Sequence, residues 1–187
     1  MTDDAEGVDV SIAPTDSAEQ SFAPHRRRSL PVLTAVIAVV VVVLDQLTKR
    51  WAVSQLTGEA PRHIVWTLQF NLARNRGMAF SQGQGIGPLI AIAALLIVLW
   101  LAWSARKVSS AVPAVAAGLV AGGALGNLAD RVFRGDRVLH GEVIDFIDFQ
   151  WFPIFNVADM AIDIGGVLFV GWTLLSHRSL KAKGRTA

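Results

Sequence analysis

The chain has 187 residues and a formal net charge of +2 at pH 7; 52% of its residues are hydrophobic and 17% are charged. A typical soluble domain carries about 25% charged residues, so this composition indicates a membrane protein with small hydrophilic tails. The length accommodates one domain and leaves no room for a second catalytic module. Because cysteine is absent, disulfide bonds, thiolate metal sites and a cysteine nucleophile are excluded.

Residues 1–29 are expected to form a disordered cytoplasmic tail. Six of the fifteen acidic residues lie among the first twenty positions, and the segment is rich in Ser, Ala and Pro. Such a segment cannot bury enough apolar surface to offset its loss of chain entropy on folding. A basic cluster at residues 25–28 then precedes the first long apolar segment.

Four apolar segments are long enough to cross the hydrocarbon core, which requires about 20 helical residues. We expect them at residues 30–51, 87–103, about 111–130 and about 156–176, followed by a basic cytoplasmic tail at 177–187. A cleaved signal peptide is a weaker interpretation of the first segment. Three more spans follow it, and Lys49 and Arg50 lie where a cleavage site has small neutral residues.

The connections between these spans differ in length and charge. The segments 52–86 and 131–155 are long, and the basic residues on the opposite side crowd next to the spans, which favours both termini in the cytoplasm. The two long segments then form a small extracytoplasmic cap. Residues 64–70 alternate as in a strand, which allows part of the cap to be sheet. The predicted fold class is an all-α membrane protein with four transmembrane helices and this cap.

Polar residues gather at one end of the predicted bundle. In an up-and-down arrangement, the C-terminal ends of spans one and three share a face with the N-terminal end of span four. The residues brought to this extracytoplasmic face are Asp45, Asn127, Asp130, Asp145, Asp148, Asn156 and Asp159. Ionisable groups at membrane depth are costly and indicate function. Solvation of helix ends is the alternative, and it explains a single residue better than it explains the whole set.

The sequence lacks the residue patterns that most catalytic mechanisms require. The four histidines are scattered, no serine has an elbow-like setting, and no phosphate-binding loop is present. Gly118, Gly122 and Gly126 recur every four residues, which is typical of a helix-packing face. What remains is carboxylate chemistry, in which one member of a pair holds a proton and the other acts as a base on water. Asp159 lies near the start of span four, where the helix dipole favours negative charge.

Five short motifs occur in a fixed order along the chain. They are DQLTK at 45–49, NRGMAF at 75–80, GGALGNLADR at 122–131, GEVIDF at 141–146 and FNVAD at 155–159. In this order they resemble lipoprotein signal peptidase, also called signal peptidase II, over about residues 30–176. Any one motif alone is a weak signal, whereas five in order are highly specific.

The resemblance implies an intramembrane aspartic endopeptidase that removes the signal peptide from diacylglyceryl-modified prolipoproteins, just before the lipidated cysteine. Residues 30–176 form the peptidase domain, with Asp145 and Asp159 as the catalytic pair and Asp130 as the alternative member. Supporting or substrate-binding positions are Asp45, Lys49, Asn75, Gly123, Asn127, Asp130, Arg131 and Asn156. We further expect no metal or other cofactor, no nucleic acid, inhibition by globomycin, contact with membrane lipid, and a monomer in the bacterial inner membrane.

Several residues depart from the family pattern. Arg76 and Met78 lie in a strip that is near substrate in the family, and Met160 and Asp163 replace residues that are usually small or uncharged. Asp163 lies about one turn deeper than Asp159 on the same helix face. Because the acyl chains of the substrate must stay in hydrocarbon, we expect sideways entry between helices, past walls near Phe80, Phe146 and Phe155.

Two other classes of protein remain open. A metal-dependent membrane transferase would use four aspartates as oxygen ligands for magnesium. The four are Asp145, Asp148, Asp159 and Asp163. Against this, Lys49 and Arg131 would lie beside the metal. A non-catalytic assembly or transport protein would use the carboxylates as a proton relay. Sensitivity to a chelator separates the transferase from the peptidase.

Overall fold

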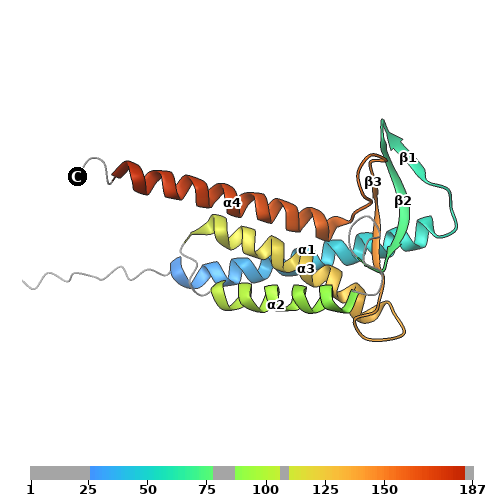
Figure 1. Cartoon of the computed structure of the whole chain (residues 1–187), viewed down its shortest axis with the longest axis horizontal. Helices are drawn as coiled ribbons and strands as arrows, with labels where there is room; N and C mark the ends of the chain where they lie inside the picture. The colour runs from blue at the N-terminus through green and yellow to red at the C-terminus, as the bar shows by residue number, and fades with distance from the viewer. Residues whose placement is uncertain (1–25, 78–86, 106–109, 184–187) are drawn as a thin grey trace, which may run out of the picture.

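A computed structural model describes residues 26–77, 87–105 and 110–183. It contains four helices, α1 (Arg26–Leu56), α2 (Gly87–Ala105), α3 (Ala111–Phe133) and α4 (Val157–Lys183), and three strands, β1 (Arg62–Val65), β2 (Leu68–Asn75) and β3 (Val143–Asp148). The helices run along a common long axis, and the small sheet stands across one end of the bundle (Figure 1). The predicted fold class, four spanning helices with a cap that contains strands, is therefore confirmed.

Each of the four helices is long and apolar enough to cross a membrane; the spans are Ser29–Leu56, Gly87–Ser104, Ala111–Phe133 and Val157–Ser176. The first span ends five residues later than predicted because Ala52 and Leu56 pack into the core of the cap with Phe146. Helical backbone also includes residues 26–29 and 177–183, which we had assigned to the tails. The rest of both tails, residues 1–25 and 184–187, lies outside the described residues.

Helix α3 is the centre of the bundle. Just over half (56%) of its 18-residue apolar stretch is buried inside the protein, against 11–17% of the corresponding stretches in the other three helices. Its glycines allow this close packing, as expected from their four-residue repeat: a Cβ on Gly122 would lie 2.7 Å from the Cβ of Val41 in α1. Thr34 of α1 adds a hydrogen bond of 3.0 Å from its hydroxyl to the carbonyl of Ala114 in α3. The α1–α3 interface therefore depends on small residues rather than on large apolar ones.

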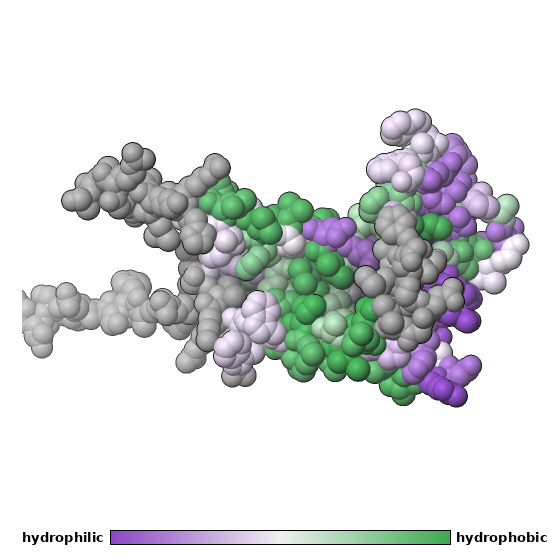
Figure 2. Space-filling view, in the orientation of Figure 1, coloured by the Kyte–Doolittle hydropathy of each residue, from purple (hydrophilic) through white to green (hydrophobic). Residues whose placement is uncertain are grey.

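The outward faces of the helices are apolar. Large exposed side chains such as Val39, Leu96 and Val167 lie along α1, α2 and α4, and Figure 2 shows this band as green, with hydrophilic residues gathered at the capped end. In water such a surface would be unfavourable, whereas in a bilayer it contacts acyl chains. The band therefore marks the part of the bundle that faces lipid.

The sheet is antiparallel, with β2 in the centre between β1 and β3. The alternating run at residues 64–70 is not a single strand, because a turn at Trp66, whose φ is +53°, folds it into the β1–β2 hairpin. The sheet is fixed to the end of α1 by Trp51, whose ring lies 5.1 Å from that of Phe70 in β2 and 6.1 Å from that of Phe146 in β3. A further bridge pairs Ile147 with Phe155, just before α4. These contacts hold β3 and the start of α4 against the ends of α1 and α3.

Candidate active site

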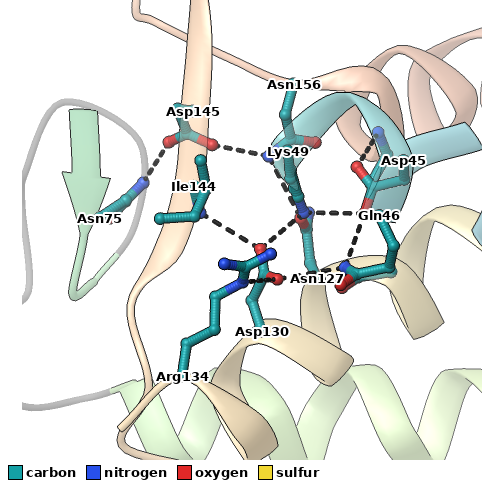
Figure 3. A network of polar contacts seen from close by, with 12 residues as sticks. Asp45, Gln46, Lys49, Asn75, Asn127, Asp130, Arg134, Ile144, Asp145 and Asn156 are labelled. Carbon is teal, nitrogen blue, oxygen red and sulfur yellow. Dashed lines mark hydrogen bonds and ion pairs between the residues drawn. The ribbon is translucent and has the colours of Figure 1, made fainter. Parts of the chain in front are cut away.

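The structure brings all ten site residues expected from the sequence to the capped end of the bundle. They come from α1, β2, α3, β3, the segment before α4, and α4 itself; Figure 3 shows the polar network that joins many of them. Several of these polar side chains are nearly or fully buried: Asp45, Lys49, Asp130, Arg131, Asp145 and Asn156. Buried polar groups are costly unless they are paired, so their partners determine what each residue can do.

Asp145 on β3 and Asp159 in the first turn of α4 both line a cavity of about 620 Å³. Asn156 links them. Its side-chain Nδ2 donates to Asp145 Oδ1 at 2.6 Å, its backbone N–H donates to Asp159 Oδ2 at 3.1 Å, and its Oδ1 accepts from the Asp159 backbone N–H at 3.0 Å. One asparagine therefore holds both carboxylates, that of Asp145 through its side chain and that of Asp159 through its backbone N–H.

Each carboxylate also receives a second amide donor. Asn75 Nδ2 donates to Asp145 Oδ2 at 3.2 Å, and Asn127 Nδ2 donates to Asp159 Oδ1 at 2.8 Å. The Asn75 amide is itself oriented, because its Oδ1 accepts from the backbone N–H of Gly77 at 2.9 Å. Both oxygens of each carboxylate therefore accept a hydrogen bond, which fixes the orientation of the two groups in the cavity.

The environment of Asp145 favours its protonated form. Burial, and after it the nearby charge of Asp159, raises the pKa of Asp145 from its ordinary value of 3.8 to about 7, although hydrogen bonds from Asn156 and Asn75 oppose the rise. A carboxyl with a pKa near neutrality can both hold and release a proton under physiological conditions. Asp145 is therefore suited to acid–base work.

Asp148, on the same strand, behaves in the opposite way. Burial acts to raise its pKa, but hydrogen bonds from the side chains of Gln69 and Asn71 and from the Gln150 backbone N–H outweigh it and leave the pKa below its ordinary value. These donors lie at 2.7, 3.0 and 2.6 Å, and Asp148 is not among the described residues that line the cavity. Asp148 instead stabilises the sheet by joining β3 to Gln69 and Asn71 of β2.

The magnesium-binding alternative is not supported by this arrangement. It needs Asp148 beside Asp145 and Asp159, yet the carboxylate of Asp148 accepts hydrogen bonds within the cap and does not line the cavity. Among the residues that the structure describes, no group of three or more acidic, histidine or cysteine side chains is placed to hold a metal ion. Asp163 does line the cavity, one turn beyond Asp159, and is exposed there without an ion pair to any described residue.

A buried lysine lies behind the acidic pair. Lys49 Nζ makes ion pairs with Asp45 Oδ2 at 2.9 Å and with Asp130 Oδ2 at 2.8 Å, and all three side chains are fully buried. The same nitrogen donates to Asn127 Oδ1 at 2.8 Å. Because that oxygen is occupied, the amide nitrogen of Asn127 is directed toward Asp159. Lys49 therefore acts on Asp159 of the acidic pair through Asn127; Figure 3 labels Lys49 and Asn127 within the network.

The second oxygens of the buried carboxylates hold the backbone. Asp45 Oδ1 accepts from the Ala158 N–H at the start of α4 at 3.0 Å, and Asp130 Oδ2 accepts from the Ile144 N–H of β3 at 3.2 Å. Asp130 does not line the cavity. Its position indicates that it orients β3, the strand that carries Asp145, and so argues against Asp130 as a member of the pair.

Gly123 and Arg131 contribute in different ways. A Cβ on Gly123 would collide with the carbonyl of Ala158, so glycine is required for α3 to approach α4 closely enough for Asn127 to reach Asp159. Arg131 lines the cavity, and its Nη2 donates to the Gly77 carbonyl at 2.8 Å. Its Nη1 is buried without a hydrogen-bond partner among the described residues.

Sequence reasoning missed Gln46 as a site residue. Its Nε2 lies 3.1 Å from Asp130 Oδ1, 3.1 Å from the Gly126 carbonyl and 3.2 Å from Asp45 Oδ2, so it bridges the two buried carboxylates across α1 and α3. The signal was its place next to Asp45 in the first motif.

The walls of the cavity are mainly apolar and come from α2, α3, α4 and the segment before α4. They include Ile90 and Ile97 of α2, Leu128 of α3 and Ile162 of α4. Phe155 lines the cavity as expected. Phe146 does not: the expectation was wrong, because its ring is buried in the cap core. The other proposed wall residue, Phe80, lies outside the described residues, as does Met78.

Comparisons with known proteins agree with one another. A family model described as signal peptidase (SPase) II matches residues 37–175. The chain is 41% identical to the lipoprotein signal peptidase of Mycolicibacterium smegmatis over 177 residues, covering 93% of this chain and 74% of that protein. It is 41% identical to that of Streptomyces coelicolor, covering 87% and 79%. A solved bacterial membrane enzyme superposes with a TM-score of 0.67 at 32% identity, covering 79% of this chain and 90% of that one.

Proposed function

Because the chain belongs to the signal peptidase II family, we propose a specific reaction for it. It is a multi-pass bacterial membrane protein whose relatives are peptidases. It removes the signal peptide from diacylglyceryl-modified prolipoproteins as an intramembrane aspartic endopeptidase. It cuts just before the lipidated cysteine and uses Asp145 and Asp159 as the catalytic pair.

The observation that supports this proposal most directly is the paired arrangement of the two carboxylates. They share one cavity, they are bridged by Asn156, and the pKa of Asp145 is raised to about 7 by burial and by the neighbouring negative charge. Two such groups share one proton at neutral pH. A pair of this kind contains both the acid and the base that peptide hydrolysis requires.

These positions support the following reaction. Asp159 takes a proton from water while the water oxygen attacks the scissile carbonyl carbon, and Asp145 gives its proton to the carbonyl oxygen. Asp159 lies in the first turn of α4, where the helix dipole favours its ionised form. When the tetrahedral intermediate collapses, the C–N bond breaks, Asp159 protonates the leaving amine, and Asp145 takes back a proton from a hydroxyl of the intermediate as the carbonyl re-forms.

The apolar walls of the cavity suit a lipidated substrate. The cavity lies between α2 and α4, which both pack against α3, so acyl chains can enter sideways without leaving hydrocarbon. We place the cap and the acidic pair on the extracytoplasmic side and both termini in the cytoplasm, with residues 30–176 as the peptidase domain and residues 1–29 and 177–187 as tails. A reporter fusion at residue 108 that lies outside would contradict this topology.

The test is cleavage of a synthetic lipidated prolipoprotein peptide by the purified protein, with and without a chelator. We expect cleavage at the bond before the modified cysteine, inhibition by globomycin, and no effect of the chelator. We also expect the active species to be a monomer without cofactor or nucleic acid. Loss of cleavage on chelation would overturn the metal-free mechanism, and failure to cut the lipidated peptide would overturn the function.

A further inference from the structure

A second cavity of about 590 Å³ lies at the capped end, outside the acidic pair's cavity. It is bordered by the start of α2, the end of α3 and the loop that leads from α3 to β3, which projects from the bundle in Figure 1. The ionisable residues around it are three arginines, one histidine and two carboxylates: Arg76, Arg134, Arg137, His140, Asp136 and Glu142. None of them belongs to the acidic pair or its hydrogen-bond donors.

The charges around this cavity leave a positive excess. Glu142 is shared by two arginines, because its carboxylate lies 2.5 Å from Arg76 Nε and 3.7 Å from Arg74 Nη1. Arg137 makes no ion pair with any residue that the structure describes, and Asp136 nearby carries one negative charge. Arg74 does not line the cavity, but it shares Glu142 with Arg76. Counted with it, three guanidinium groups (Arg74, Arg76 and Arg137) face two carboxylates (Glu142 and Asp136), which leaves a net charge of +1.

Arg134 adds hydrogen-bond donors without changing this balance. Its Nε pairs with Asp130 Oδ1 at 2.6 Å, which neutralises its charge. An arginine has five N–H donors in a fixed fork, so the remaining donors of this partly exposed side chain can serve the cavity.

The loop that carries these residues is fixed by its own hydrogen bonds. The His140 backbone N–H donates to the Arg137 carbonyl at 3.1 Å, and the His140 ring Nδ1 donates to the Val138 carbonyl at 3.0 Å. The Gly141 N–H donates to the Arg131 carbonyl at 2.9 Å. A Cβ on Gly135 would lie 2.8 Å from the Cα of Gly141, so the two ends of the loop touch. Arg137 is therefore presented by a loop that its own contacts hold in place.

The position of the cavity points to lipid. It lies where the α2 and α3 spans reach the capped end of the bundle, which is the level of the lipid headgroups. Phe133 and Val138, which flank Arg134 and Arg137 in the sequence, are 82% and 69% exposed. In Figure 2 strongly hydrophilic and hydrophobic surfaces adjoin at this corner of the molecule. Guanidinium groups that lie beside exposed apolar side chains match a phosphate next to its acyl chains.

We propose that this second cavity binds the phosphodiester headgroup of one phospholipid from the leaflet on the capped side. Arg137 and Arg76 contact the phosphate, and Phe133 and Val138 lie against the acyl chains. A phosphodiester carries one negative charge, which matches the excess of one positive charge around the cavity. The site is separate from peptide cleavage, because Arg137 lies outside the acidic pair's cavity.

The test uses the full-length protein in detergent and native mass spectrometry. Wild type, the double variant R76Q/R137Q and the control variant Arg62→Gln are each titrated with dioleoyl phosphatidylglycerol. Arg62 is an exposed arginine on β1, without an ion pair to any described residue, and it controls for general surface charge. Dioleoylglycerol, which lacks the phosphodiester, and inorganic phosphate as a competitor are the two further arms.

We expect one phosphatidylglycerol to remain bound to wild type and to Arg62→Gln, and the double variant to bind it about tenfold more weakly. Dioleoylglycerol should not distinguish wild type from the double variant, and phosphate should compete only at far higher concentration. Equal weakening by Arg62→Gln, or undiminished binding by the double variant, overturns the site. Competition by phosphate at the concentration of the lipid overturns the lipid as its source. Cleavage of a lipidated peptide by Arg137→Gln should match wild type, so failure of the lipid site and failure of the proposed function are distinguishable.

Discussion

Replacing Asp145 by asparagine is expected to stabilise the protein at pH 8 while it abolishes the proposed activity. The pKa of Asp145 is near 7 in the folded protein because the group is buried next to Asp159, and its ordinary value is 3.8. Holding this group ionised in the folded protein therefore costs about 4 kcal/mol once the pH exceeds 7. An asparagine has no charge to bury, and it keeps the shape of the aspartate.

Part of this gain is lost in hydrogen bonding. Asp145 accepts one amide from Asn156 and one from Asn75, on different oxygens, and an asparagine has only one oxygen. Loss of one such bond costs about 1 kcal/mol, so the net stabilisation is about 3 kcal/mol. For a domain of this size that corresponds to roughly 6–12 °C in melting temperature.

The sign of the pH dependence follows from the raised pKa. The contribution of Asp145 to stability is fully present below about pH 4 and is lost as the pH rises through 7. The difference in melting temperature between Asp145→Asn and wild type should therefore grow from pH 4 to pH 8. Tryptophan fluorescence of the detergent-solubilised protein, recorded during heating at several pH values, measures it.

Asp148→Asn provides a matched control on the same strand with the opposite sign. The pKa of Asp148 is lowered, since three hydrogen-bond donors outweigh the effect of burial, so its contribution to stability is present near pH 7 and is lost as the pH falls. This variant should melt below wild type at pH 7, and the difference should shrink in acid. If Asp145→Asn melts at or below the temperature of wild type at pH 8, burial does not raise the pKa of Asp145 and the reasoning is wrong.

Further substitutions test the rest of the site. Asp145→Asn and Asp159→Asn should each reduce cleavage of a lipidated peptide by several orders of magnitude, and the double variant should be barely worse, since residues that act as a unit are not additive; additive losses would contradict a shared mechanism. Asp130→Asn should leave residual turnover and Asp163→Asn should lose least, and if Asp130→Asn abolishes cleavage while Asp145→Asn keeps most of it, the pair is wrongly assigned. Lys49→Met leaves the buried Asp45 without its cation and leaves Asp130 with Arg134 alone, and it should destabilise the protein by about 3–5 kcal/mol, seen as a lower melting temperature; an unchanged melting temperature would show that the ion pairs do not matter. A peptide without acyl chains should be cut far more slowly than the lipidated one, and equal rates would refute sideways entry in hydrocarbon.

The spans could be predicted from the sequence because a run of about 20 apolar residues has few other structures available to it. Their ends could not, because the last turns of α1 are fixed by packing. Ala52 and Leu56 are buried against Phe146 of the cap, a contact that no local pattern shows. For the same reason Phe146 was wrongly expected to face lipid: a phenylalanine in the cap core and one on a membrane surface look alike in sequence.

From the sequence, the ten candidate site residues could be placed at one end of the bundle, but the contacts between them could not be predicted. The motifs bring the polar residues together in the fold, yet the sequence does not show which face of α1 turns toward α3. That rotation decides that Lys49 meets Asp130 as well as its helical neighbour Asp45, and that Gln46 bridges the same carboxylates. The acid–base character of Asp145 likewise depends on burial and on Asp159, which are properties of the folded protein alone.

The ion pairs behind the site also bear on how the chain enters the bilayer during synthesis. Asp45 and Lys49 are four residues apart on α1, and Asp130 of α3 is four residues before Arg134, which caps the C-terminal end of that helix. Each helix therefore carries its own neutralising partner one turn away, before it has met the other helix. In a nascent segment with such an internal pair the two opposite charges cancel, so the pair brings no net charge into the hydrocarbon. Insertion of each helix can then precede assembly, and the two local pairs merge into one network only when α1 and α3 dock.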